Sequence, residues 1–456
     1  MNQSTNSSAT PLIASLTAAL ATSVALWSAW FITHLPWINL DERASMPALL
    51  GIWIVACSFA CRWISPAPKF LTAATVGLLS ACVGLLLVGS KLVEAPAADG
   101  TAGPIKPNAA LMAGGFLALG AIVGSVSGLL ARMLPCACRS DASDPPAQAW
   151  LARLALVNAA AVFPLLVVGG LVTTSGSGMA VPDWPNTYGS NMFLYPLGPR
   201  AQPGVFLEHS HRLFGTLIGL ATIITTISTL AVERRRGPKI WAVVLLALVC
   251  AQGVLGGTRV LHNSPYEALV HGVLGQVIFG WAVILAAMLT FAFRAPLSPT
   301  FAGDNPRARR LRRFATASLH LTTLQLLMGA WYRHLRTPHA LYTHMALSIL
   351  VMTLVVLAVI AALDLKPAPD RLSTSLRRAA YALLFVVAAQ FLLGWAAWSL
   401  PKPLVRSAHQ ANGALTLGLV AWLGILGLKV PRPKFFSGQS AAEAPKPACN
   451  PPGSDR

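Results

Sequence analysis

Twelve apolar runs, each about as long as a membrane crossing, dominate this 456-residue sequence. A helix needs about 20 mostly apolar residues to cross the hydrocarbon core of a bilayer. Because unpaired backbone groups cannot face lipid, a chain with this pattern is expected to fold as helices that pack side by side. The runs lie at 12–33, 47–64, 70–91, 109–133, 151–172, 208–231, 240–257, 267–293, 311–332, 340–363, 376–399 and 404–428.

The charged residues support the same class of protein. Only 11% of the residues are charged, whereas a soluble domain carries roughly a quarter. The formal net charge of +19 is not gathered into one basic patch, because the Lys and Arg residues cluster in short connections such as 233–236 and 307–313. That distribution follows the positive-inside rule and excludes a nucleic-acid-binding role.

The same basic connections predict the orientation of the chain. The connections 232–239, 294–310 and 364–375, and the tail after 428, are rich in Lys and Arg, so we expect them on the cytoplasmic side. The long connection 173–207 holds a single Arg and is expected outside. The first ten residues contain no Lys or Arg, which argues against a cleaved signal or a transit peptide.

A spacing of glutamine, glycine and histidine recurs in the second part of the chain. Glycine follows glutamine by four residues, and histidine follows glycine by fifteen, in three copies: Gln252, Gly256 and His271; Gln325, Gly329 and His344; Gln390, Gly394 and His409. A degenerate fourth copy is Leu165, Gly169 and His211, with its loop enlarged to hold 173–207. The repeat predicts four helical hairpins, each with a histidine at the outer start of its second helix.

These hairpins define the predicted domains. We expect an all-α integral membrane protein in which 151–293 and 311–428 form two pseudo-symmetric four-helix bundles, eight helices in all. A cytoplasmic linker, 294–310, joins them. About four extra transmembrane helices in 1–133, of unknown role, precede them through a linker at 134–150, and a disordered tail, 429–456, follows. Cys136 and Cys138 in the first linker are interpreted as ordinary thiols.

The four histidines are candidate ligands of a metal. A small residue follows each of them by four positions, and small residues alone are explained by close helix packing. Packing does not require imidazole at matched depth in four helices, however. The set lacks thiolates and carboxylates, so zinc is not expected, whereas haem iron takes axial imidazoles. Adjacency pairs His211 with His271 and His344 with His409.

Ionisable groups near these histidines are further candidates. Glu208 precedes His211 by three residues and shares its helix face, and a carboxylate at the mouth of a membrane helix is a functional candidate by default. The alternative is an interfacial salt bridge from Glu208 to an arginine. Arg212, Arg259 and Arg333 stand at the same outer level, where they fit either haem propionates or a snorkelling role. His209, about 200° round the helix from His211, cannot serve the same centre.

These residues carry a resemblance to a known family. The Glu208-x-x-His211-Arg212 motif, the four histidines on alternate helices and the loop Gly176–Pro185, GSGMAVPDWP, resemble the haem A synthases over about 151–428. Some members of that family carry a cysteine pair in the outer loop after the first helix. Residues 173–207 contain no cysteine, so this chain resembles the cysteine-free branch and no thiol-dependent step is expected.

The resemblance implies an oxidoreductase that converts haem O to haem A, a ring methyl becoming a formyl group, for terminal oxidases. It implies that His211 and His271 take haem O as substrate, that His344 and His409 hold a permanent haem b, and that Glu208 is the essential acid. It also implies a multi-pass protein of the bacterial inner membrane with its haem sites toward the outside. Haem O synthase and a membrane electron acceptor are the partners we expect.

Two other functions remain open from the residues alone. One is a di-haem b-type protein that passes electrons to or from quinone, and the other is a haem transporter or chaperone. Neither function requires an acid beside a ligand, so Glu208 favours the enzyme.

Overall fold

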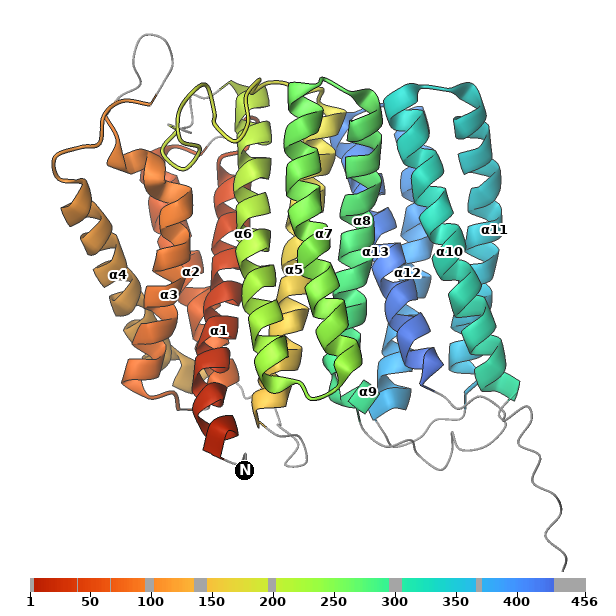
Figure 1. Cartoon of the computed structure of the whole chain (residues 1–456), viewed down its shortest axis with the longest axis horizontal. Coiled ribbons are helices and arrows are strands. Elements are labelled where there is room, and N and C mark those ends of the chain that lie inside the picture. The colour runs from red at the N-terminus through yellow and green to blue at the C-terminus, as the bar shows by residue number, and fades with distance from the viewer. Residues whose placement is uncertain are drawn as a thin grey trace, which may run out of the picture.

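A computed structural model shows a row of long helices that run in alternating directions (Figure 1). It describes residues 4–38, 40–65, 67–94, 102–134, 146–195, 202–294, 306–365 and 371–429. Within these ranges there is no β-strand, only the two isolated bridges Val93↔Ile105 and Thr187↔Ser190. The predicted all-α membrane fold is therefore confirmed.

The helices extend the apolar runs by several residues at their ends, often with a proline in the first turn. They are α1 (Ser4–Thr33), α2 (Glu42–Ile64), α3 (Phe70–Val88), η1 (Gly89–Leu92), α4 (Ala109–Leu130), η2 (Ala131–Met133), α5 (Pro146–Thr174), α6 (Pro203–Val232), α7 (Arg236–Leu261), α8 (Pro265–Leu289), α9 (Phe291–Arg294), α10 (Pro306–Leu335), α11 (Pro338–Leu363), α12 (Arg371–Ser399) and α13 (Pro403–Leu428).

Eleven of the described helices are long and apolar enough to cross a membrane. The predicted crossing 311–332 lies in α10, which does not reach that composition because polar residues such as His320 and Gln325 interrupt its apolar run. Helix α10 nevertheless packs along α11 and α13 and has their length. Its neighbours therefore place it among the long helices of the bundle.

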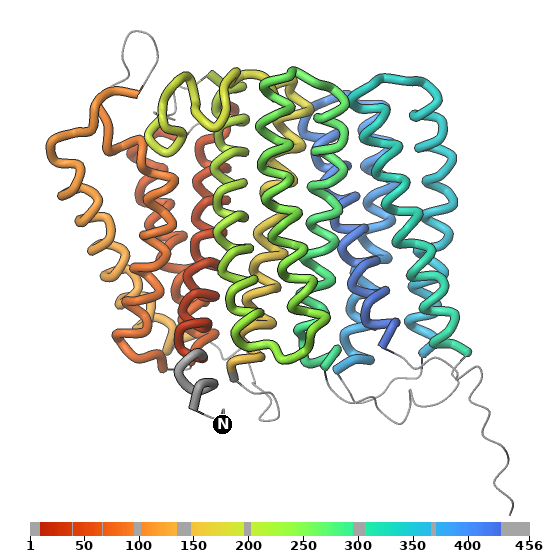
Figure 2. The backbone as a smooth tube through the Cα atoms, viewed as in Figure 1, coloured from red at the N-terminus to blue at the C-terminus, as the bar shows by residue number. Residues whose placement is uncertain are grey.

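The long helices form three four-membered groups side by side (Figure 2). In each group every helix packs on two neighbours, in the cyclic orders α1–α2–α4–α3, α5–α6–α7–α8 and α10–α11–α12–α13. Helices α6 and α8 consequently lie diagonally across the middle group, as α11 and α13 do across the last. Side chains from diagonal helices meet at the centre of a bundle, where such proteins build cofactor sites.

The groups contact one another through a few helices. Helix α1 packs on α5 and α6, while α13 packs on α5 and α8, and α10 on α8. Small residues bring the backbones close at these contacts, as with Gly170 beside Ser407. A hydrogen bond of 2.9 Å joins the hydroxyl groups of Thr174 and Ser407 across the two histidine-bearing groups.

Several predicted segments fall outside the described residues. The linker 134–150, with Cys136 and Cys138, the connection 294–310 and the tail 429–456 lie there for most or all of their length. The helices around them show that α1 begins and α13 ends at the same face of the molecule (Figure 1). The connection 232–239 lies at that face as well, and the loop after α5 lies at the opposite one.

The orientation can be tested with single cysteines in a chain whose seven native cysteines have been replaced. Asn186 is exposed in the loop after α5, and Gly237 is exposed in the basic connection before α7. We expect an impermeant thiol reagent added outside intact cells to label Asn186→Cys and not Gly237→Cys, because basic connections stay in the cytoplasm. Labelling of Gly237→Cys alone would reverse the orientation.

Candidate functional site

The four repeat histidines meet in two pairs near the ends of the helices that adjoin the loop after α5. The imidazole centroids of His211 on α6 and His271 on α8 are 6.2 Å apart, with the rings at 76° to each other. Those of His344 on α11 and His409 on α13 are also 6.2 Å apart, at 81°. The structure thus brings the histidines together in the two combinations that adjacency predicts.

A glycine on the preceding helix makes room for each imidazole. A methyl group added to Gly169, Gly256, Gly329 or Gly394 would lie 2.9, 2.9, 2.9 and 3.1 Å from Cε1 of the facing histidine. Carbon atoms normally pack at about 3.5–4.0 Å, so only glycine fits at these positions. This contact explains the constant spacing between glycine and histidine in the repeat.

The repeat glutamines tie the two helices of a hairpin together. The Nε2 groups of Gln252 and Gln325 donate hydrogen bonds of 2.9 Å to the backbone carbonyls of His271 and His344. Gln390 differs, because its Nε2 lies 3.3 Å from the His409 ring and its Oε1 accepts a 2.8 Å bond from Asn412. The glutamine thus fixes the height of the histidine relative to the helix before it.

The same helices orient the imidazole rings. The Nδ1 of His344 lies 3.0 Å from the carbonyl oxygen of Gln325, which makes Nδ1 the protonated nitrogen and Nε2 the acceptor, 3.4 Å from the Gln325 Nε2 group. The Nδ1 atoms of His211 and His271 are buried and have no hydrogen-bond partner among the described residues. A metal-bound imidazole normally has such a partner on its second nitrogen, and the backbone of Leu165 and Gln252 lies beside these two rings.

The donor set and spacing fit a haem. Two imidazoles that bind one iron from opposite faces at about 2 Å each have ring centres roughly 6 Å apart. Below His211, Gly215 and Gly219 meet no other atom within 4 Å of where a side chain would begin, so that face of α6 is open. No group of three or more metal-binding side chains occurs within the described ranges, as a zinc site would need.

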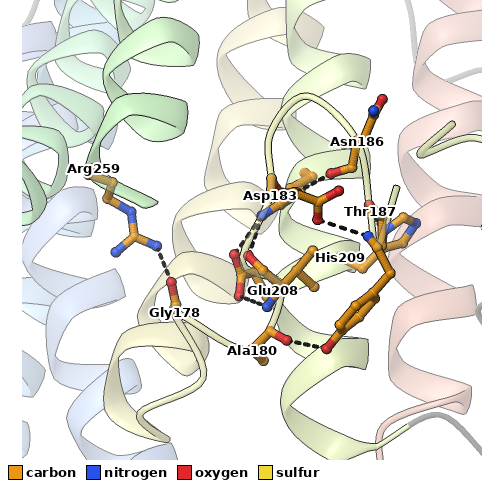
Figure 3. A network of polar contacts seen from close by, with 11 residues as sticks. Gly178, Ala180, Asp183, Asn186, Thr187, Glu208, His209 and Arg259 are labelled. Carbon is orange, nitrogen blue, oxygen red and sulfur yellow. Dashed lines mark hydrogen bonds and ion pairs between the residues drawn. The ribbon is translucent and has the colours of Figure 1, made fainter. Parts of the chain in front are cut away.

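Glu208 is buried and binds the loop that follows α5. Its Oε2 accepts a 2.9 Å hydrogen bond from the backbone N–H of Val181, and its Oε1 is paired with Arg212 at 2.9 Å. We call residues 175–195 the outer loop. The carboxylate thus joins α6 to this loop (Figure 3).

The guanidinium group of Arg212 also binds the outer loop. Its Nη1 donates to the carbonyls of Asp183 and Asn186 at 2.7 and 2.9 Å, and its Nη2 donates to Val181 at 3.0 Å and to Glu208. Both terminal nitrogens are therefore occupied by protein groups. The salt bridge that sequence analysis left as an alternative for Glu208 is present in the structure.

Arg259 and Trp184 extend the outer loop toward α7. The Nη2 of Arg259 donates a 3.1 Å hydrogen bond to the Gly178 carbonyl, as Figure 3 shows. The Trp184 indole lies directly over Gly257, where any larger residue would collide with it. The loop therefore reaches from α5 and α6 to α7 at the outer end of the first bundle.

Arg333 has no comparable loop to hold. It lies in α10 near the positive charges of Arg336 and Arg406, and its Nε is buried without a hydrogen-bond partner among the described residues. A buried guanidinium with an unused donor is expected to bind an anionic group. Of the three candidate arginines, Arg333 keeps the most donors free.

Three other histidines lie outside the two pairs. His209 is buried beside Tyr195, and its Nδ1 lies 3.1 Å from the Thr187 hydroxyl, so it binds the outer loop. The place of His320 inside the apolar run 311–332 predicts a buried side chain, but the side chain is exposed and its Nδ1 lies 2.8 Å from the Thr316 carbonyl. His334 falls in a connection, which predicts exposure to solvent, but it is partly buried in α10 beside Gly272 of α8. Neither Thr187 nor Tyr195 belongs to a repeated pattern that sequence reasoning could have used.

The glycine contact gives a direct test of the histidine geometry. Gly256→Ala places a methyl group 2.9 Å from His271, and overpacking of this kind costs about 1–3 kcal/mol. We expect this variant to lose haem from the first pair, measured by the absorbance spectrum of the purified protein. Gly253→Ala on the same helix meets nothing within 4 Å and is the matched control. Equal haem content in both variants would contradict the proposed contact.

Comparisons with known proteins point to one family. The family model described as "cytochrome oxidase assembly protein" matches residues 152–347, which include the outer loop and three of the four repeat histidines. Similar curated proteins are each named "Heme A synthase": one from Shouchella clausii (29% identical over 30% of this chain and 45% of the relative), one from Parvibaculum lavamentivorans (29%, over 43% and 62%) and one from Nitrosospira multiformis (26%, over 62% and 93%).

The extent of these matches agrees with the repeat. The chain spans about half to three-fifths of the length of the first two relatives, and nearly all of the third. The family match begins at the start of α5 and excludes α1–α4. By the family match, the shared name of the relatives and the histidine-bearing hairpins, the chain is similar to the haem A synthases.

Proposed function

We propose that this protein is a haem A synthase, an oxidoreductase that converts the ring methyl of haem O to a formyl group to make haem A for terminal oxidases. The observation that supports this most strongly is the presence of two histidine pairs with the same 6.2 Å separation, one in each bundle. The relatives named "Heme A synthase" support the choice of reaction.

The two pairs differ in what covers them, which supports different roles. His211 and His271 lie under the outer loop, with a buried carboxylate beside them, and we assign haem O as their substrate. His344 and His409 belong to the half without such a loop among the described residues, and we assign them a permanent haem b. When bound, that haem supplies one-electron redox chemistry.

Glu208 is the acid–base candidate of the first site. Its carboxylate is held by the Val181 N–H and by Arg212, so its position is fixed before any substrate binds. At the edge of the first pair it can accept a proton from the reacting methyl or stabilise positive charge there. Arg212 holds the carboxylate and the loop, and this positioning role replaces the propionate contact first considered for it.

The remaining arginines are candidates for haem propionates. Arg333 keeps an unused buried donor one helical turn after Gly329, which faces His344, and Arg259 lies near the first pair. Guanidinium groups pair well with carboxylates. The outer level of these residues supports haem sites toward the extracytoplasmic side of the bacterial inner membrane. We expect a membrane electron acceptor and haem O synthase as partners.

The haem b assignment predicts the behaviour of the second pair. His344→Ala or His409→Ala should remove the haem b and leave the fold largely intact, because each removes one axial ligand. The measurement is the pyridine haemochrome spectrum of the purified variants. His320→Ala, in the same bundle but exposed, should keep its full haem content. Retention of full haem b by both ligand variants would exclude this pair as the binding site.

The role of Glu208 can be separated from its loop contacts. Glu208→Gln removes the charge and the base, and its amide can satisfy only one of the two donors that the carboxylate now binds. We expect this variant to bind haem yet accumulate haem O or partly hydroxylated haem, seen by chromatography of extracted pigments. General acid–base groups typically contribute about 10²–10⁴-fold to a rate, so little haem A should form.

The control for that experiment is Arg212→Gln. This variant breaks the same ion pair and loosens the same loop, but it keeps the carboxylate of Glu208. If Glu208 acts on the substrate, Glu208→Gln should be the more severe change by at least about tenfold in haem A formed. Equal losses in the two variants would show that Glu208 only holds the loop.

A further inference from the structure

The N-terminal helices contact the outer loop on the side away from the histidines. The loop has an inner arm, residues 176–184, and an outer arm, residues 186–195. Glu208 and Arg259 bind the inner arm, and Arg212 binds the inner arm and the first residue of the outer arm, Asn186. The rest of the outer arm contacts His209 and residues of the 1–133 region.

Two backbone contacts join the outer arm to the N-terminal region. The N–H of Ala102 donates a 2.7 Å hydrogen bond to the Ser190 hydroxyl, which is itself nearly buried. Gly89, at the outer end of α3, lies directly against the carbonyl oxygen of Phe193, where any side chain would collide with the loop backbone. These two residues come from either side of the hairpin closed by the Val93↔Ile105 bridge.

An aromatic cluster joins α1 to α6. On α1, Trp27 packs edge-on against Phe214 with ring centroids 5.9 Å apart, and Phe31 stacks on Phe206 at 5.6 Å. Trp27 is fully buried, and Phe193 of the outer arm packs against the same cluster. Aromatic pairs of this kind stabilise a contact beyond their buried area. The N-terminal helices are therefore tightly joined to α6.

The cluster and the catalytic candidate lie on opposite faces of one helix. Phe206, Leu213, Phe214 and Leu217 of α6 pack toward α1. At 100° per residue, the face that carries Glu208, His211 and Gly215 lies roughly opposite. Close packing on one face of α6 also fixes the position of its other face, because densely packed protein interiors transmit displacements.

We propose that residues 1–133 form a positioning unit that holds the outer arm of the outer loop against α6. In doing so the unit keeps the Val181–Glu208 contact closed beside the first histidine pair. This gives a role to the four helices that the family match does not cover. The effect on the Glu208 site rests on the proposed function, whereas the contact between residues 1–133 and the outer loop does not.

The test measures hydrogen–deuterium exchange in the full-length protein. Gly89→Val pushes the Phe193 carbonyl away, while Gly51→Val on α2 meets nothing within 4 Å and is the matched control. We expect Gly89→Val to raise exchange about tenfold at the N–H groups of Thr187, Ser190 and Val181, which are now hydrogen-bonded. Ser190→Ala, a milder change, should raise exchange at the same amides by a smaller factor.

Haem readouts distinguish a positioning role from general damage. We expect Gly89→Val to form less haem A while keeping the haem b of the second pair. If hydrogen exchange in the outer loop is unchanged in both Gly89→Val and Ser190→Ala, the proposal is wrong. It is also wrong if the exchange rate rises equally over α5–α8. If the unmodified protein makes no haem A, the proposed function fails, but the exchange result still decides whether residues 1–133 hold the loop.

Discussion

The contact between an imidazole and a glycine of the neighbouring helix underlies the architecture of both histidine-bearing bundles. Each ring needs the space that a missing side chain leaves, so the second helix of every hairpin is fixed in height and rotation against the first. Four such contacts lie at the same depth, and they bring the imidazoles of α6 and α8, and those of α11 and α13, to face each other across each bundle. The equal separation of 6.2 Å in both bundles follows from this repeated contact.

The two bundles then diverge through a single enlarged connection. In the first, the outer loop carries the groups that bind Glu208 and Arg212, and it covers the outer end of the bundle. The second bundle joins α10 to α11 through only two residues, so it has no equivalent cover. A duplicated scaffold thus acquires two different environments while its ligand positions stay the same. This asymmetry is what a substrate site and a permanent cofactor site require.

Sequence reasoning predicted those parts of the fold that a periodic signal encodes. Apolar run length gave the helices, and the glutamine, glycine and histidine spacing gave the hairpins and the pairs. The repeat did not reveal what its glycine does, however. Gly169 and its equivalents face the imidazole from the preceding helix, and only the folded structure shows this contact.

The contacts of the outer loop could not be predicted in this way. Glu208 binds the backbone N–H of Val181, 27 residues away, and a backbone donor leaves no trace in residue identity. The hydrogen bond from the Ala102 N–H to the Ser190 hydroxyl joins residues 88 positions apart in the sequence, and it depends on how α1 and α3 pack. Such contacts depend on tertiary packing alone, which explains why His209 and the N-terminal helices had no assigned role.

The arrangement of the three bundles in one row also restricts how a hydrophobic molecule can reach the first histidine pair. Helices α5 and α6 contact α1, and α5 and α8 contact the second bundle, whereas α7 packs chiefly on α6 and α8 and keeps its outward flank uncovered by another group. Its outward residues, Ile240, Val243 and Val254, are exposed and apolar, as a lipid-facing surface requires. The seams beside α7 therefore lie next to lipid, on the side from which a tailed porphyrin dissolved in the bilayer would approach.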